Sequence, residues 1–179
     1  MSNQPRLFFA LPLSTSQRQP IVRWRDHALA ESPASGRRVA AEDLHVTLAF
    51  LGSTPPQLAP ALLGAAEGIA ATAFGLTLDA CEYWAKPQLL ALTASDIPAP
   101  LATLAASLRE LSAQLGLHRA KLDYRPHLTL VRDLPLLPAL PQAPQFTFTA
   151  PAFSLFESVL GRQGPRYIEL ARWPLRIAP

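Results

Sequence analysis

Two short segments of this sequence repeat the same pattern of side chains. Residues 45–48 read His-Val-Thr-Leu, and residues 127–130, which begin 82 positions later, read His-Leu-Thr-Leu. A chance match of both copies is a poor explanation for this repeat. An imidazole, with its ordinary pKa of ~6.5, gains or loses a proton close to neutral pH, and a hydroxyl can donate a hydrogen bond to an anion. The pair of segments therefore predicts acid–base chemistry.

The alternation of side chains along a strand gives the repeat a geometry. If each segment is a β-strand, His45 and Thr47 share one face, as do His127 and Thr129, and the aliphatic residues occupy the other face. Two such strands facing each other across a groove would bring both His-Thr pairs to a single anion. A neutral imidazole could then take a proton from a nucleophile, and a charged one could protonate a leaving alkoxide. The threonine hydroxyls could hold phosphate oxygens as charge develops on them. This chemistry needs neither a metal ion nor a covalent intermediate.

Plainer interpretations of the histidines and the cysteine compete with this one. A single His-x-Thr segment is most simply a half-buried strand. His27 fits a helix surface and His118 a loop, and a zinc site would need ligands that the sequence does not place near the motif histidines. Cys81, the one cysteine, lies in a strand pattern and is expected to be a small core residue. A single cysteine excludes an intramolecular disulfide and a multi-cysteine metal cluster.

The elements that must position the motifs follow from apolar patterning and from turn and capping residues. Expected strands cover residues 7–13, 44–51, 74–84, 88–93, 127–132, 146–149, 153–160 and 167–173. Expected helices cover residues 17–30, 55–71 and 100–115. Residues 32–38 and 134–144 are expected loops, and residues 161–164 are an expected hairpin turn. Because the order lacks a regular βαβ rhythm, it favours an α+β fold with mostly antiparallel sheets.

Length and composition limit the class of protein. The 179 residues fit one domain, and 49% of them are hydrophobic, which is enough for a core. Eight glycines and 19 prolines are too few for a collagen-like or low-complexity chain. The net charge of +3 is too small to argue by itself for wrapping a duplex. No uncharged apolar stretch is long enough to span a bilayer, so a cytoplasmic location is expected. The sequence does not reveal an oligomeric state, and a monomer is the default expectation.

The two motifs and the residues around them resemble the 2H phosphoesterase superfamily, which is defined by two H-x-T/S-x motifs. Within it the sequence is similar to the bacterial and archaeal RNA 2′,3′-cyclic phosphodiesterases, also called 2′-5′ RNA ligases or the LigT-like group. The resemblance covers nearly the whole chain. It includes residues 6–12, 44–52, 125–132, 155–158 and 167–175.

This resemblance implies that residues 1–179 form a single bilobal α+β domain. Two mainly antiparallel sheets would flank a pseudo-two-fold central cleft, with helices on the outside. The implied reaction is metal-independent hydrolysis of RNA 2′,3′-cyclic phosphate ends to 2′-phosphomonoesters, with no cofactor. The partner would be RNA with such an end, for example a tRNA fragment, with no membrane and no obligate protein partner.

The resemblance also implies a role for each motif residue. His45 would be the proton donor to the departing 3′-oxygen, and His127 the proton acceptor that activates water. Thr47 and Thr129 would bind the phosphate. On the residues alone the near-symmetry of the motifs leaves the choice of acid and base open.

Other basic residues lie close to the second motif. Arg132 matches a family arginine that would add positive charge for the phosphate, but strict strand alternation places it on the face opposite His127. A bulge, or the end of the strand near Val131, would be needed to redirect it. Arg125 and Lys121 could contact the RNA backbone or could be solvated loop charges.

Other substrates and roles stay open at this point. Tyr83, Trp84 and Tyr124 could stack on a base or could pack in the sheet. The same chemistry could act on a small cyclic nucleotide or an ADP-ribose cyclic phosphate, or the cleft could bind RNA ends without turnover. The reverse displacement, with an RNA 5′-hydroxyl in place of water, would form a 2′-5′ bond. Hydrolysis should win unless the cleft holds both RNA ends.

Overall fold

The described part of the chain is built mainly from β-strands. The structure, a computed structural model, describes residues 4–30, 36–118, 123–137, 139, 142, 144–161 and 164–176. The strands are β1 (Arg6–Pro12), β2 (Arg37–Arg38), β3 (His45–Ser53), β4 (Phe74–Leu78), β5 (Ala80–Trp84), β6 (Leu89–Thr93), β7 (His127–Arg132), β8 (Phe146–Ala150), β9 (Ala152–Gly161) and β10 (Gly164–Pro174). The α-helices are α1 (Thr15–Ala28), α2 (Ala59–Glu67) and α3 (Ala99–Gln114), and the short 3-10 helices are η1 (Ala41–Asp43) and η2 (Pro56–Leu58).

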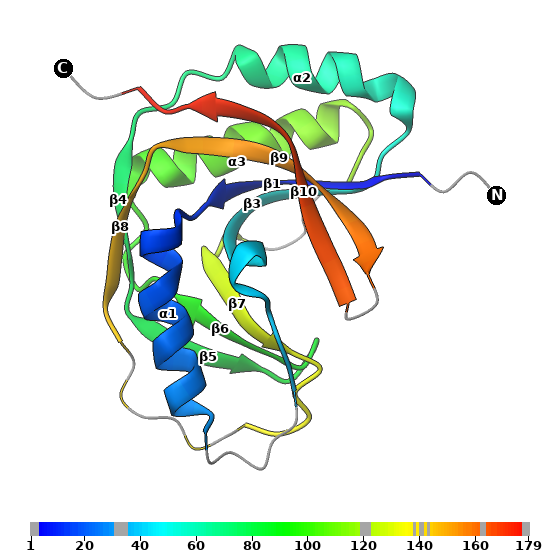
Figure 1. Cartoon of the computed structure of the whole chain (residues 1–179). Coiled ribbons are helices and arrows are strands. Elements are labelled where there is room, and N and C mark those ends of the chain that lie inside the picture. Colours follow the sequence, from blue (N-terminus) through cyan, green and yellow to red (C-terminus); the bar gives the residue numbers. More distant parts are fainter. Residues whose placement is uncertain are drawn as a thin grey trace.

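Eight of the described strands form one continuous sheet. Its order is β10-β9-β1-β3-β7-β6-β5, with β2 beside β7, and these neighbours are antiparallel. Within the described residues, Val46 and Leu128 are the one residue pair that joins β3 to β7. The sheet therefore has two halves that meet at this joint (Figure 1). β4 and β8 form a separate antiparallel ribbon.

The helices are fixed by caps and by packing on the strands. The Ser14 hydroxyl accepts a hydrogen bond from the Gln17 N–H at 3.3 Å, and Gln17 Oε1 accepts one from the Ser14 N–H at 2.7 Å, which makes a capping box at the start of α1. Trp24 of α1 packs against Phe146 of β8, with ring centroids 6.5 Å apart. α3 contacts β3, and α2 contacts both α3 and β10. The three helices thus lie around the outside of the strands (Figure 1).

β1 lies at the centre of the first half of the sheet. It pairs with β3 along one edge and with β9 along the other, and residues 7–11 are all buried. A continuous apolar run is typical of a strand that is covered on both faces. β1 therefore holds β3, and with it the first motif, at a fixed place in the core.

Most of the predicted elements are confirmed, and the agreement is closest where the motifs lie. β3 and β7 begin at the two motif histidines, and α1 and α3 lie within two residues of the ranges expected for them. The predicted loops and the hairpin turn lie partly outside the described residues, and Lys121 lies wholly outside them.

The helix expected over residues 55–71 was wrong in extent. The chain instead forms η2 and then α2, which ends at Glu67 before Gly68. Pro60 lacks an amide hydrogen, so it fits only the first turn of an α-helix, and α2 accordingly begins at Ala59. No helix within the described residues is long and apolar enough to cross a membrane.

The single strand expected over residues 74–84 was also wrong. It is broken at Asp79 into β4 and β5, which belong to different sheets. The Asp79 carboxylate accepts a hydrogen bond from the Ser95 N–H at 2.8 Å and so fastens the break to the chain beyond β6. The loop expected over residues 32–38 contains β2, which pairs with the end of β7.

Candidate functional site

β3 and β7 bring the two His-Thr motifs side by side. The aliphatic pair that joins these strands is fully buried, and continuing its antiparallel register by one residue places each motif's histidine next to the other motif's threonine. His45 thus lies beside Thr129, and His127 beside Thr47. Because neighbouring residues of a strand point to opposite faces, these four residues share the face away from the buried pair.

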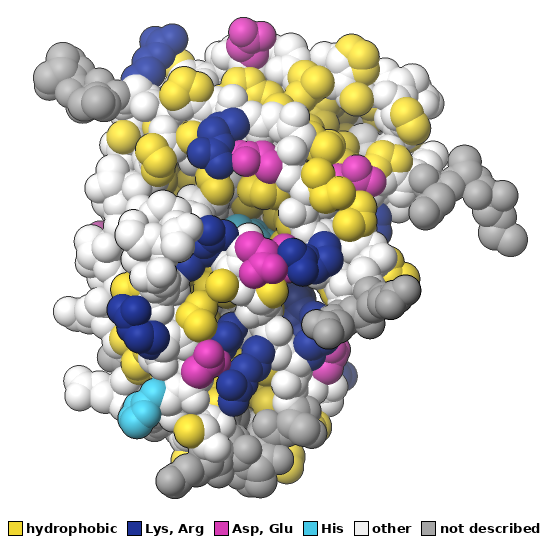
Figure 2. Space-filling view, viewed as in Figure 1, with side chains coloured by type: hydrophobic (Ala, Val, Ile, Leu, Met, Phe, Trp, Pro, Cys, Tyr) yellow, Lys and Arg dark blue, Asp and Glu magenta, His cyan; other side chains and the backbone are white. Residues whose placement is uncertain are grey.

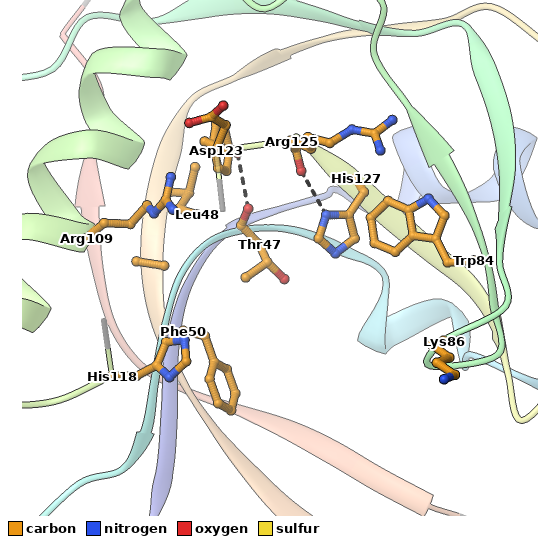
Figure 3. Close-up of a pocket in the computed structure, with 12 residues that line it drawn as sticks. Thr47, Leu48, Phe50, Trp84, Lys86, Arg109, His118, Asp123, Arg125 and His127 are labelled. Carbon is orange, nitrogen blue, oxygen red and sulfur yellow. Dashed lines mark hydrogen bonds between the residues drawn. The ribbon is translucent and has the colours of Figure 1, made fainter. Parts of the chain in front are cut away.

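A backbone carbonyl fixes the orientation of each motif histidine. His45 Nδ1 lies 2.7 Å from the carbonyl oxygen of Asp43, and His127 Nδ1 lies 2.9 Å from that of Arg125 (Figure 3). A carbonyl oxygen can only accept a hydrogen bond, so Nδ1 carries the hydrogen in both rings. In the neutral state Nε2 is therefore the nitrogen that can take up a proton. In both rings the hydrogen bond to the backbone carbonyl uses Nδ1 and not Nε2.

The two imidazoles have different surroundings. The His45 ring lies among three aromatic rings, with centroid distances of 4.9 Å to Phe8, 4.9 Å to Tyr167 and 6.3 Å to Phe156. The His127 ring lies 4.8 Å from the indole of Trp84. The two similar motifs therefore place their histidines in different surroundings: three aromatic rings enclose His45, and a single indole lies beside His127.

Two cavities extend from the motifs, one toward each histidine. The His45 cavity, of about 610 Å³, has walls that include Arg6, Phe8, Arg37, His45, Arg132 and Tyr167. The His127 cavity, of about 600 Å³, has walls that include Leu48, Trp84, Arg109, His118, Arg125 and His127 (Figure 3). Thr47 and Phe50 line both cavities, which therefore meet at Thr47. Figure 2 shows basic side chains interspersed with acidic ones across the middle and lower part of one face of the molecule.

A bulge in β7 turns Arg132 toward the motifs. Across from two successive residues of β6, β7 has three, at positions 129–131. The extra residue reverses the alternation beyond it, so Arg132 comes to line the His45 cavity with His45 and Thr47. Arg132 Nε is buried and has no hydrogen-bond partner. Since buried polar atoms are nearly always paired, this N–H is a donor poised for an anion.

The structure does not bring every candidate residue into the cavities. Thr129 is 9% exposed and lies outside the described linings of both. The Tyr83 hydroxyl donates to the carbonyl of Leu134 at 3.0 Å, which anchors this ring away from the motifs. Tyr124, in contrast, lines the His127 cavity, and its hydroxyl donates to the carbonyl of Thr47 at 3.1 Å and so braces β3. Among the described residues, no three His, Cys, Asp or Glu side chains gather in a way that could hold a metal ion.

The sequence also matches a known family along most of its length. The family model described as the 2′-5′ RNA ligase superfamily matches residues 12–159. The chain belongs to this superfamily. An RNA 2′,3′-cyclic phosphodiesterase of Escherichia coli (strain K12) is 37% identical over 98% of this chain and 99% of its own length. One from Geobacillus stearothermophilus is 29% identical over 96% of this chain, which spans 58% of that relative.

Solved structures of superfamily relatives have the same fold. Escherichia coli LigT complexed with 3′-AMP superposes with a TM-score of 0.89 at 34% identity, and covers 97% of this chain and 99% of its own. A crystal structure described as a phosphoesterase superposes with a TM-score of 0.91 at 34% identity over the same shares of the two chains. The predicted α+β fold of the 2H phosphoesterases is thereby confirmed.

Burial lowers the pKa of both motif histidines of this superfamily member. Enclosure by neighbouring groups lowers the pKa of His45 to about 4, and the positive charges of Arg132 and His127 add to the decrease, whereas the hydrogen bond to the Asp43 carbonyl opposes it. The pKa of His127 is also lowered, again chiefly by burial, with Arg132 and Arg125 adding to the effect. Both rings are therefore largely neutral at pH 7 when no anion is bound.

Glu82 connects the groups that surround His127. Its carboxylate accepts hydrogen bonds from Trp84 Nε1 at 2.9 Å, from the Thr93 hydroxyl at 3.0 Å, and from Arg125 Nη2 at 2.7 and 2.8 Å. These hydrogen bonds, that of Trp84 first, lower the pKa of the Glu82 carboxyl. Glu82 thus holds both the indole beside His127 and the residue whose carbonyl orients it. The sequence motifs give no sign of this role, because it arises from pairing between β5, β6 and the approach to β7.

The lowered pKa of His45 makes stability depend on pH. The unfolded chain protonates this ring near pH 6.5 and the folded protein near pH 4, so the unfolded state binds more protons between these values. The stabilisation is complete above about pH 6.5 and is lost as the pH falls toward 4, by roughly 3 kcal/mol. In urea titrations over this range, His45→Gln should lose less stability than the wild type. His27→Gln, on the exposed side of α1, is the control; equal slopes for all three proteins would contradict the expectation.

Loss of the Glu82 charge should lower the pKa of His127 further. The positive charge of Arg125 already acts in this direction, and Glu82→Gln would leave it unbalanced. An NMR titration of the His127 ring in the variant measures the change. Glu169→Gln is a matched control, since Glu169 is equally exposed and also binds an arginine, Arg172, with both oxygens. An unchanged His127 pKa in Glu82→Gln would overturn this account.

Proposed function

We propose that this protein hydrolyses RNA 2′,3′-cyclic phosphate ends to 2′-phosphomonoesters by acid–base catalysis with two histidines. The observation that carries the proposal is the pair of imidazoles, both with Nε2 available, on either side of Thr47. Arg132, with its unpaired Nε, adds a donor and a positive charge for an anion at the same place. The Escherichia coli relative named RNA 2′,3′-cyclic phosphodiesterase and the LigT structures with 3′-AMP and with phosphate support this substrate class.

Each group has one task in the proposed reaction. The phosphate lies at Thr47 and Thr129, whose hydroxyls donate to its non-bridging oxygens, and Arg132 balances its charge. His127 Nε2 takes a proton from water as the water oxygen bonds to phosphorus. His45 Nε2 gives a proton to the 3′-oxygen as the bond from phosphorus to that oxygen breaks, and the phosphate stays on the 2′-oxygen. One copy of the chain supplies all of these side chains, which fits a monomer.

The proposed donor must be protonated, although its pKa is about 4 in the free protein. The bound substrate supplies the missing stabilisation, because a negative phosphate beside His45 favours the imidazolium. Inorganic phosphate should therefore raise the pKa of His45 in an NMR titration. In Arg132→Gln the pKa should be higher before phosphate is added, since the Arg132 charge helps to lower it, and phosphate should change it less. A phosphate-independent pKa in the wild type would contradict this role for His45.

The proposed function is tested with an RNA oligonucleotide that ends in a 2′,3′-cyclic phosphate, in excess EDTA. The wild type should form the 2′-phosphate end. His45→Ala and His127→Ala should each lose about 100- to 10,000-fold in rate, because each proton transfer contributes that much. His27→Ala, which changes an exposed histidine of α1, should keep the wild-type rate.

Two other results would redirect the assignment. Faster turnover of a cyclic mononucleotide or an ADP-ribose cyclic phosphate than of the oligonucleotide would favour a small-molecule substrate. Binding of the RNA end without turnover at any pH from about 5 to 9 would favour a binding module, because a pair of imidazoles should be active within that range.

A further inference from the structure

The residue two positions before each motif histidine has a charged side chain that is tied to a neighbouring strand. Arg125 precedes His127, its guanidinium is bound by Glu82 of β5, and its backbone carbonyl orients the His127 ring. Asp43 precedes His45, and its backbone carbonyl orients the His45 ring in the same way. The Asp43 side chain takes no part in that hydrogen bond, so its contacts show what holds the carbonyl in place.

The Asp43 carboxylate is buried and is bound by β10 through both of its oxygens. Oδ1 accepts a hydrogen bond from the Tyr167 backbone N–H at 3.1 Å, and Oδ2 lies 3.1 Å from Nε of Arg166. The Asp43 side chain is only 5% exposed. A carboxylate that is buried to this extent needs hydrogen bonds and an opposite charge, and two adjacent residues of one strand supply both. Asp43 is therefore fastened to β10 at two points.

Tyr167 connects this contact to the ring of His45. Its backbone N–H reaches the Asp43 carboxylate, and its side chain meets the His45 imidazole edge-on with ring centroids 4.9 Å apart. Asp43 itself ends η1, a single short turn that has no side-chain cap. Because a turn of this kind is held by few backbone hydrogen bonds, contacts with its neighbours decide where its carbonyls lie. One residue of β10 thus encloses His45 and, through Asp43, also holds the carbonyl that orients it.

We propose that the Asp43 carboxylate is a positioning group, which holds the Asp43 carbonyl against His45 Nδ1 and so makes Nε2 the nitrogen that exchanges the proton. This inference rests on the proposed function, in which His45 Nε2 gives a proton to the 3′-oxygen. In the charged ring both nitrogens carry hydrogen, and the hydrogen on Nδ1 stays bound to the carbonyl. Without the carboxylate, η1 can move relative to β10, and the neutral ring can carry its hydrogen on either nitrogen.

This role depends on an oxygen at the right distance rather than on negative charge. In Asp43→Asn the side chain keeps its length and an oxygen that can accept the Tyr167 N–H, but it loses the attraction to Arg166. In Asp43→Ala both contacts are lost. Glu42 belongs to the same turn and binds the same guanidinium at 2.9 Å. Glu42→Ala is therefore a matched control, because it leaves the hydrogen bond between Asp43 and Tyr167 in place.

The test reads the tautomer of both motif histidines from the nitrogen-15 NMR shifts of their rings, at about pH 8, where both rings are neutral. Asp43→Ala should give a mixture of tautomers at His45 and leave that of His127 unchanged. On the oligonucleotide substrate its kcat should fall about 10- to 100-fold with KM changed less than about threefold, because misplacement of a reacting group costs about that much. Asp43→Asn and Glu42→Ala should keep the wild-type tautomer and a kcat within about threefold of the wild type.

A wild-type tautomer at His45 in folded Asp43→Ala would overturn this inference, as would an equal loss of kcat in Asp43→Asn and Asp43→Ala. If Asp43→Ala does not fold, both rings lose their wild-type shifts, and Asp43→Glu then decides the question. Glutamate keeps the charge but is longer by one methylene, so it should disturb the His45 tautomer more than Asp43→Asn does, and the reverse order would overturn the inference. Absence of hydrolysis by the folded wild type would instead overturn the proposed function, and the tautomer measurement would not depend on it.

Discussion

The site depends on the pairing of β3 with β7, which runs through one residue pair in the described part of the chain. Val46 and Leu128 pair between β3 and β7 and are fully buried, which places the His-Thr faces of both motifs next to each other. A slip of one residue in either strand would turn that strand's histidine toward the core, since side chains alternate with a period of two. A longer pairing would keep the strands together and leave less room for the cavities on either side of Thr47. The brevity of this joint is therefore as important to the site as its register.

The two motif histidines have different properties because different strands surround them. Rings from β1, β9 and β10 enclose His45, and they lower its pKa by keeping water away. His127 is held by polar contacts that run through Glu82 to the indole of Trp84 and to Arg125. An enclosed ring that becomes charged only beside an anion suits a proton donor. A ring with a single indole beside it suits an acceptor that must meet an incoming nucleophile. The two motifs are nearly identical in sequence, and the difference between their histidines comes from the rest of the sheet.

Short sequence patterns predicted the features that depend mainly on neighbouring residues. The alternation in the two motifs, the apolar run of β1 and the capping residues before α1 are each written within a few neighbouring positions, and the structure has these elements where they were expected. The face on which Arg132 lies could not be predicted from strand alternation, because the bulge that turns it depends on the partner strand β6. Sequence patterns did not predict the break between β4 and β5 at Asp79 or the hydrogen bonds that Glu82 accepts. Both features depend on partners that are distant in the sequence.

β1 precedes its two neighbours in the sequence, and one of them, β9, follows it by about 140 residues. A growing chain on the ribosome therefore carries an apolar strand with one edge unpaired until β9 has emerged. Exposed edges of this kind invite association with other chains, and pairings between distant residues form slowly. Phe8 reaches Phe156 and Tyr167 only when this sheet closes. The enclosure of His45 thus forms only after β9 and β10 have been made, and a chain that lacks these strands lacks it.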